Sequence, residues 1–123
     1  MKNLITCLAV GALSSATFAT TWAVDDDGKA DFDSLQAALD DVLVVDGDEI
    51  IVMPGTYTST APYEVVDMRN KAVWMHSAAG ADVTIIDGES TRRGIHCSGD
   101  VEGMVIEGFT ITTSNPSSLS MVK

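Results

Sequence analysis

Hydrophobic positions follow two different periods along this chain. Between residues 33 and 42, apolar side chains recur every three or four positions, which is typical of one face of an α-helix. Asp33 has the residue type of an N-cap, and Gln36 stands where a capping box places its partner. The predicted apolar face of this helix consists of Phe32, Leu35, Ala38, Leu39 and Val42.

From residue 50 onward, short β-branched or alternating runs are separated by Gly, Asp, Asn and Pro, a pattern that predicts strands. Pro54 and Gly55 follow the first run and predict its end, because proline lacks the N–H that a sheet needs. Many short strands are compatible with an antiparallel sandwich and with a solenoid. The predicted strands are residues 50–52, 63–66, 72–76, 83–86, 94–97 and 104–112.

Two rows of matched spacing favour the solenoid over the sandwich. Successive members are 23 and 22 residues apart in one row, and 20 and 20 residues apart in the other. A repeat in the low twenties, with about two strands in each repeat, is typical of stacked coils that share one core. The rows are Ile51, Trp74 and His96, and Val65, Ile85 and Val105.

Three segments, residues 31–39, 47–57 and 106–112, resemble the N-terminal part of right-handed parallel β-helix proteins, the pectin lyase-like superfamily. The resemblance covers roughly residues 22–112 and implies a helix that covers the first coil. We therefore expect an all-β solenoid, a right-handed parallel β-helix with an N-terminal capping helix and about three coils. Because no second cap follows, we expect it to be incomplete at its C-terminus.

The first residues have the features of a targeting signal. Lys2 precedes an apolar run at residues 4–13, and residues 17–19 fit the small-x-small cleavage pattern. The run is shorter than the roughly 20 residues that span a bilayer. We therefore expect residues 1–19 to be a signal peptide, residues 20–113 to be the β-helix domain and residues 114–123 to be a tail or a truncated continuation. The protein is then secreted or held at the cell exterior.

The chain is strongly acidic, with 18 Asp and Glu against 7 Lys and Arg and a net charge of −11. Such a surface repels nucleic acid and anionic lipid, so we exclude both as partners. It also offers carboxylates to a hard cation, and Asp25, Asp26 and Asp27 form the densest group. These three are candidate Ca²⁺ ligands, with a solvated turn as the alternative.

Cysteine usage excludes a stapled fold. Removal of residues 1–19 takes away Cys7 and leaves Cys97, which cannot form an internal disulfide alone. Alternation places Cys97 on the same face as Ile95, so we expect it to be a small buried hydrophobe. His76 has no evident carboxylate neighbour in the sequence.

Candidate binding residues come from the outward positions of the predicted strands. If Val73 and Met75 face the core, Trp74 faces outward, and the same rule turns His96 outward. Trp74 and His96 can stack on sugar rings, or they can lie under a loop of the chain. Arg92 and Arg93 lie in a predicted turn and can pair with a uronate carboxylate, with plain solvation as the alternative.

No catalytic constellation is recognised, and no residue matches the active-site motifs of the enzymes that the resemblance brings to mind. The leading expectation is a non-catalytic structural or carbohydrate-interaction module, with polysaccharide as its partner. The first alternative is the N-terminal portion of a polysaccharide lyase or carbohydrate esterase whose active site lies beyond Lys123. The second is an adhesive surface protein that self-associates through its C-terminal coil.

Overall fold

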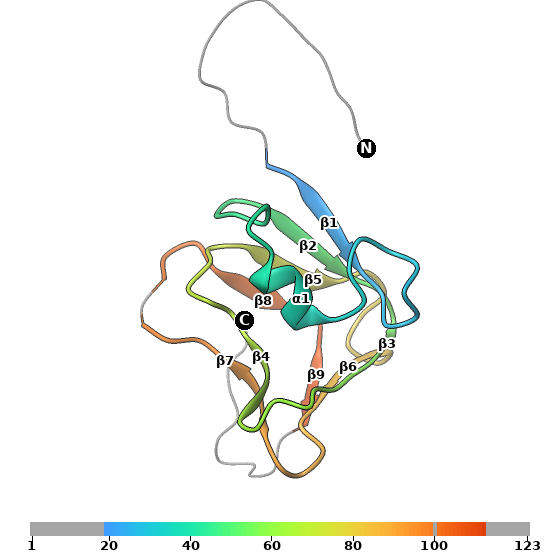
Figure 1. The fold of residues 1–123 in the computed structure, drawn as a ribbon. Coiled ribbons are helices and arrows are strands. Elements are labelled where there is room, and N and C mark those ends of the chain that lie inside the picture. The colour runs from blue at the N-terminus through green and yellow to red at the C-terminus, as the bar shows by residue number, and fades with distance from the viewer. Residues whose placement is uncertain (1–18, 100, 113–123) are drawn as a thin grey trace, which may run out of the picture.

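The computed structural model describes residues 19–99 and 101–112, which form a parallel β-solenoid of about three turns (Figure 1). The predicted tail, and all of the predicted signal peptide except Ala19, lie outside the described residues. The elements in chain order are β1 (Thr21–Val24), α1 (Leu35–Asp40), β2 (Glu49–Val52), β3 (Gly55–Tyr57), β4 (Glu64–Asp67), β5 (Trp74–Ser77), β6 (Thr84–Asp87), β7 (Arg93–His96), β8 (Val105–Glu107) and β9 (Thr110–Thr112).

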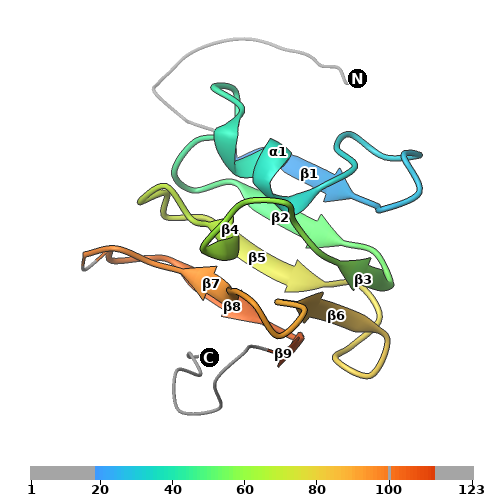
Figure 2. The same ribbon diagram turned by 60° about the horizontal axis from the view of Figure 1, so that its bottom comes forward.

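The described strands form three parallel sheets, one with four strands, one with three and one with two. Their orders are β1-β2-β5-β8, β3-β6-β9 and β4-β7. Each strand pairs with its counterpart in the next turn, and every printed pair of neighbours is parallel, as the solenoid requires (Figure 2). The prediction of a parallel solenoid is confirmed, and antiparallel hairpins are excluded for the described strands.

The predicted repeat length is wrong, because one turn holds three strands and not two. In the four-stranded sheet Thr21 pairs with Glu49, Glu49 with Trp74 and Trp74 with Val105, which are steps of 28, 25 and 31 residues. The predicted row that joined Trp74 to His96 therefore does not exist, because His96 pairs with Asp67 in the two-stranded sheet.

The second predicted row fails for the same reason. Val65, Ile85 and Val105 lie on β4, β6 and β8, which belong to three different sheets. The strands β1 and β3 were not predicted at all. The regular 20-residue spacing compared strands that face different sides of the solenoid.

The sequence Pro54-Gly55 turns a corner and does not end the strand region, since β3 begins at Gly55. The amide of Gly55 donates to the carbonyl of Val83, which continues the ladder into the next turn. A Cβ at Gly55 would lie 2.5 Å from the Asp26 carboxylate, so glycine leaves the space that this side chain needs. Gly108, with φ of 85°, likewise divides the single strand predicted at residues 104–112 into β8 and β9.

The interior of the solenoid is apolar, and alternation along the strands decides which residues enter it. Ile50, Val52 and Met75 are fully buried, as predicted, whereas Trp74 between them in space remains 42% exposed. Each buried side chain of this size contributes roughly 1.5–3 kcal/mol to the free energy of unfolding. The largest fully buried side chains are Leu35, Leu39, Ile50, Met68, Met75, Ile86, Val24, Val44, Val52, Val66, Val73 and Thr84.

Helix α1 is shorter than predicted and begins differently. Its N-cap is Ser34, whose hydroxyl accepts a hydrogen bond from the amide of Ala37, so the predicted capping by Asp33 is wrong. The helix ends at Asp40 because Asp41 is extended and its carboxylate accepts the amide of Leu43 instead. Leu35, Ala38 and Leu39 are buried as expected. Val42 was assigned to the same face but is 85% exposed beyond the helix end.

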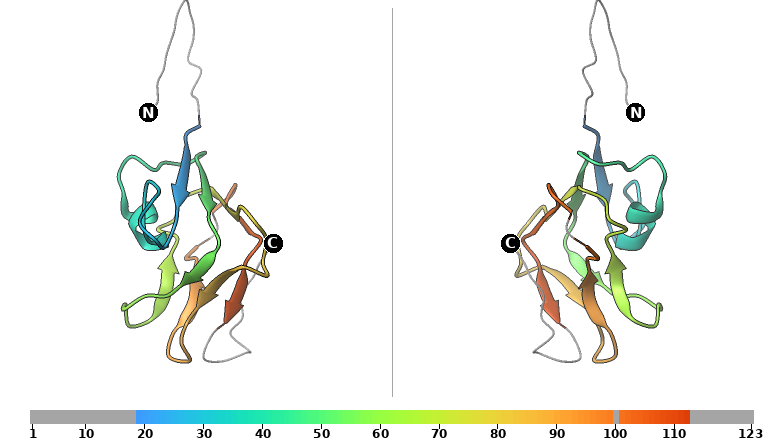
Figure 3. Two further views of the ribbon diagram at one scale, coloured as in Figure 1. Left: turned by 90° about the vertical axis from the view of Figure 1, so that its right-hand side faces the viewer. Right: turned by 90° about the vertical axis from the view of Figure 1, so that its left-hand side faces the viewer.

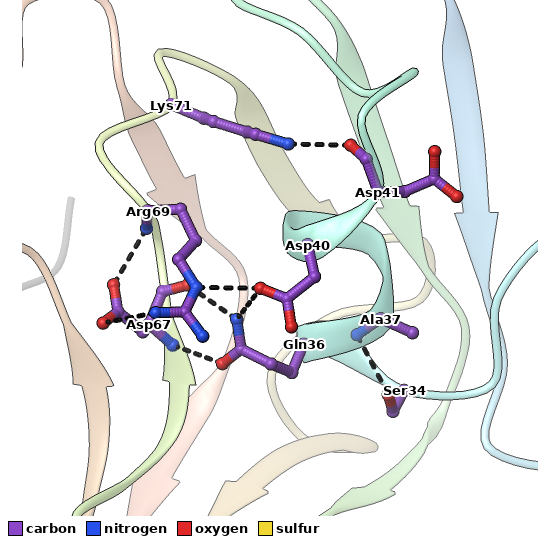
Figure 4. A network of polar contacts seen from close by, with 8 residues as sticks. All are labelled: Ser34, Gln36, Ala37, Asp40, Asp41, Asp67, Arg69 and Lys71. Carbon is purple, nitrogen blue, oxygen red and sulfur yellow. Dashed lines mark hydrogen bonds and ion pairs between the residues drawn. The ribbon is translucent and has the colours of Figure 1, made fainter.

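A polar network ties α1 to the turn after β4 (Figure 4). The Gln36 side-chain amide donates to the carbonyl of Asp67 at 3.1 Å and accepts the amide of Asp67 at 2.8 Å. Arg69 pairs with Asp40 at 2.8 Å, and Lys71 donates to the carbonyl of Asp41. Gln36 thus binds the edge of β4 as a neighbouring strand would, and α1 packs beside β4 and β1 (Figure 3).

Candidate functional site

The outer face of the four-stranded sheet carries two rows of four side chains. The register aligns them across β1, β2, β5 and β8, with about 4.8 Å between neighbouring strands. One row carries Thr21, Glu49, Trp74 and Val105, and the other carries Ala23, Ile51, His76 and Glu107. The residues between them, of which Ile50, Met75 and Ile106 are buried, face the interior.

Trp74 and His76 form a flat aromatic platform on this face. They lie two residues apart on β5, so both point outward. Their ring centroids are 4.0 Å apart and the ring planes differ by 19°, which is a stacked arrangement. Trp74 is 42% exposed, whereas the side chain of His76 is 19% exposed. The histidine therefore supports the indole, which keeps a large part of its surface in solvent.

Two glutamates hold the edges of the platform. Glu107 Oε2 accepts a hydrogen bond from Trp74 Nε1 at 2.7 Å. Glu49 Oε2 lies 2.6 Å from His76 Nε2, and Glu49 Oε1 accepts from Thr21 Oγ1 at 2.9 Å. We call Thr21, Glu49, Trp74, His76 and Glu107 the outer-face cluster. It contacts all four strands, so the register of the sheet fixes its shape.

The hydrogen bond from His76, supported by the one from Thr21, lowers the pKa of Glu49 from its usual value. The side chain of Glu49 is 25% exposed, so the ionised carboxylate stays in reach of solvent. Glu49 therefore holds negative charge beside the aromatic platform.

The expectation that His76 has no carboxylate neighbour is wrong. Glu49 precedes it by 27 residues and reaches it diagonally across the β2–β5 pair. Only the correct 25-residue step from Glu49 to Trp74 shows this contact. The sequence signal is the outward position of both residues in their strands, which the incorrect row obscured.

The structure separates the predicted sugar-binding residues. Trp74 faces outward as predicted, but His96 lies on β7 in the two-stranded sheet and does not join it. The predicted combination of Trp74 with His96 is therefore wrong. His76, on the same strand as Trp74, takes the place that was assigned to His96.

Arg92 and Arg93 make contacts within the fold. Arg92 Nε donates to the carbonyl of Ala61 at 2.7 Å, and its Nη1 lies 2.7 Å from Glu89. Arg93 lies 3.5 Å from Glu64 on the neighbouring strand β4. Both guanidinium groups thus support the turns and strands around the two-stranded sheet, away from Trp74.

The three consecutive aspartates form a turn in which two of the carboxylates accept backbone hydrogen bonds. Asp25 Oδ1 accepts the amide of Asp27, and Asp27 Oδ1 accepts the amide of Lys29. The Asp26 carboxylate packs against Gly55. Across residues 19–99 and 101–112, no group of three or more His, Cys, Asp or Glu is arranged to hold a metal ion. A Ca²⁺ site at these aspartates stays a prediction.

Cys97 is exposed, so the prediction that it is buried is wrong. It follows the last residue of β7, where the alternation of the strand no longer applies. Desolvation of the thiol, together with the charge of Asp67, raises the pKa of Cys97. A raised pKa lowers the fraction of thiolate, so this thiol is a poor nucleophile.

An open hollow of about 670 Å³ lies beside the C-terminal end of α1. Its apolar part includes Val42 and Val45, which are exposed, and its cations are Arg69 and Lys71. Arg69 is already paired with Asp40, and Lys71 donates to a backbone carbonyl. The hollow therefore offers little free charge to a ligand, and we regard the outer-face cluster as the better candidate site.

Comparison of the chain with protein-family models, with curated protein sequences and with solved structures yields no match. Among the described residues, no helix is long and apolar enough to cross a membrane. The case for a function therefore rests on the geometry of the outer-face cluster.

Proposed function

We propose that this chain is a non-catalytic carbohydrate-interaction module of the cell exterior, with the outer-face cluster as its contact surface. The observation that carries the proposal is the half-exposed indole of Trp74, stacked on His76 at 4.0 Å. A flat aromatic ring with a wet edge can cover the C–H face of a sugar ring while the sugar hydroxyls stay in reach of polar groups.

The surrounding groups suit such a ligand. Carboxylates are strong acceptors for hydroxyl donors, and Glu49 and Glu107 stand on either side of the platform in the register of the sheet. The platform is built on strands and is held by printed hydrogen bonds to both carboxylates. A rigid site loses little conformational entropy when it binds, which favours affinity.

The proposal includes the wider setting that the sequence suggested. We propose a right-handed coil of the pectin lyase-like type, in which α1 caps the first turn, and export after removal of residues 1–19. The parallel solenoid and the packing of α1 on β1 and β4 support the fold part of this proposal. The apolar run at residues 4–13 supports the export part.

Replacement of Trp74 tests the proposed function. Binding of soluble oligosaccharides of several classes would be measured by calorimetry for the chain from residue 20 onward and for Trp74→Ala. We expect Trp74→Ala to weaken binding at least about tenfold, because aromatic stacking is worth roughly 1–3 kcal/mol per ring. Tyr63→Ala is the matched control, since Tyr63 is an aromatic residue with 68% exposure outside this sheet. Equal loss in both variants, or no binding by the parent, would refute the proposal.

A second candidate is the N-terminal portion of a polysaccharide lyase or carbohydrate esterase. The contact between Glu49 and His76 favours it, because a carboxylate that orients an imidazole is a common arrangement for a general base. We expect the purified chain alone not to cleave or de-esterify pectin-like polymers. Reproducible turnover that His76→Ala or Glu49→Gln abolishes would establish the enzyme instead.

A further inference from the structure

We propose that the outer-face cluster prefers saccharides that carry a protonated amino group over neutral sugars and over uronic acids. This inference rests on the proposed carbohydrate function and assigns the class of ligand. It reverses the uronate preference that Arg92 and Arg93 suggested, because both arginines lie away from the platform.

The charge on this face of the solenoid has one sign. The eight outward positions of the four-stranded sheet include Glu49 and Glu107 and no Lys or Arg. The five cationic side chains among the described residues belong to other elements: Lys29 follows β1 in a loop, Arg69 and Lys71 follow β4, and Arg92 and Arg93 lie at the start of β7. A cationic ligand therefore meets attraction on this face without competition from a protein cation.

The aromatic platform adds to this attraction. A cation over the face of an indole gains electrostatic energy from the ring quadrupole, and tryptophan is the best of the aromatic side chains for this contact. Glu107 is exposed and uses Oε2 to hold Trp74 Nε1, so its Oε1 can accept a hydrogen bond from an ammonium group. One amino group can thus contact both the ring and the carboxylate.

A uronate polymer meets the opposite situation. The chain carries a net charge of −11, and the two carboxylates nearest the platform would face the carboxylates of the polymer. Like charges at such distances repel, and the repulsion grows where the ligand displaces water. Neutral sugars lose neither attraction nor repulsion and should fall between the two classes.

The test compares ligands of equal length in one buffer that keeps the amino groups protonated. The probes are oligomers of glucosamine, of N-acetylglucosamine, of glucose and of galacturonate, with affinity measured by calorimetry at low and high salt. We expect the glucosamine oligomer to bind about tenfold tighter than its acetylated form at low salt, with the difference shrinking as salt screens the charges.

Glu107→Gln removes one charge and keeps an oxygen for Trp74 Nε1. We expect this variant to lose most of the amine preference while it still binds neutral oligomers. Asp33→Asn is the matched control, because Asp33 is an exposed carboxylate just before α1 and its loss changes the net charge equally. The salt series on the parent chain tests the inference even if Glu107→Gln folds poorly.

The possible outcomes separate the two proposals. Equal affinity for the amine and acetylated oligomers, or tightest binding of galacturonate, would overturn the preference and leave the carbohydrate function standing. Equal effects of Glu107→Gln and Asp33→Asn would also overturn it, because a general charge effect would then suffice. Failure of all four oligomers to bind would refute the proposed function itself.

Discussion

At the scale of single residues, buried polar groups differ in how well the fold satisfies them. Asp48 is 3% exposed and accepts hydrogen bonds from the amides of Thr20 and Val45 and from the indole of Trp22. The hydroxyl of Thr84 is fully buried, and it has no hydrogen-bond partner among the described residues. An unpaired hydroxyl in an apolar interior costs free energy, so Thr84 is a weak point of the core.

Thr84→Val should raise the free energy of unfolding by about 1 kcal/mol, because it exchanges the unpaired hydroxyl for a methyl group of similar size. Chemical denaturation of both proteins would measure the change. Thr110→Val is the control, since Thr110 donates to the carbonyl of Ala81 at 2.7 Å and should gain nothing from the exchange. A destabilised Thr84→Val protein would show that this hydroxyl does find a partner.

Tyr57 predicts a stability change at alkaline pH. Burial, together with the charge of Asp26, raises the pKa of Tyr57 from 10.0 to about 12. Since the folded protein holds the phenol proton more tightly, this stabilisation is complete below pH 10.0 and is lost as pH rises toward about 12. Denaturation at a series of alkaline pH values should show the loss in the parent and a flatter profile in Tyr57→Phe. Parallel profiles would contradict the shift.

At the scale of elements, side chains complete the strand edges at the α1 end of the solenoid. The carboxylate of Asp31 accepts the amide of Ala23 on β1, and Phe32 exchanges backbone hydrogen bonds with Ala23 and Asp25. The amide of Gln36 does the same for β4. Unpaired edges invite further strands, so these contacts protect this end against unwanted pairing.

Leu35→Asp should destabilise the domain by about 3–5 kcal/mol, because it places an unpaired charge under α1. Leu35 is 2% exposed and packs in the core. Val42→Asp should change the free energy of unfolding by less than about 0.5 kcal/mol, because Val42 is 85% exposed. Thermal or chemical denaturation of the two variants side by side would measure both. An unchanged melting temperature in Leu35→Asp would contradict this position of the helix.

At the scale of the whole molecule, the two ends of the solenoid differ. The strands β7, β8 and β9 are the last in their sheets, and no strand among residues 19–99 and 101–112 pairs with their outer edges. Phe109 and Ile111 are only partly buried against the core at this end. Apolar side chains that are left in contact with water forfeit roughly 1.5–3 kcal/mol each, which favours association there.

We expect the isolated chain to be marginally stable or to self-associate through the end formed by β7, β8 and β9. The net charge of −11 opposes contact between copies, so added salt should promote association by screening the repulsion. Sedimentation velocity across a series of protein and salt concentrations would measure this. A monomer under all conditions, with strong hydrogen-exchange protection at residues 104–112, would show that the edge is covered.

The sequence by itself determined the features that depend on neighbouring residues. Alternation along a strand assigned Met75 to the core and Trp74 to the surface, and helical spacing assigned Leu35 and Leu39 to a buried face. The short strands predicted parallel stacking. These features follow from side-chain direction, which repeats every two residues in a strand and every 3.6 in a helix.

Only the tertiary structure decided which strands meet. The turns of the four-stranded sheet take 28, 25 and 31 residues, because the connecting loops vary in length and each full turn holds three strands. No local period reports such unequal steps. The register that results brings Glu49 to His76 and Glu107 to Trp74, and it carries His96 to another sheet. The candidate site is therefore a product of register, which long-range packing selects.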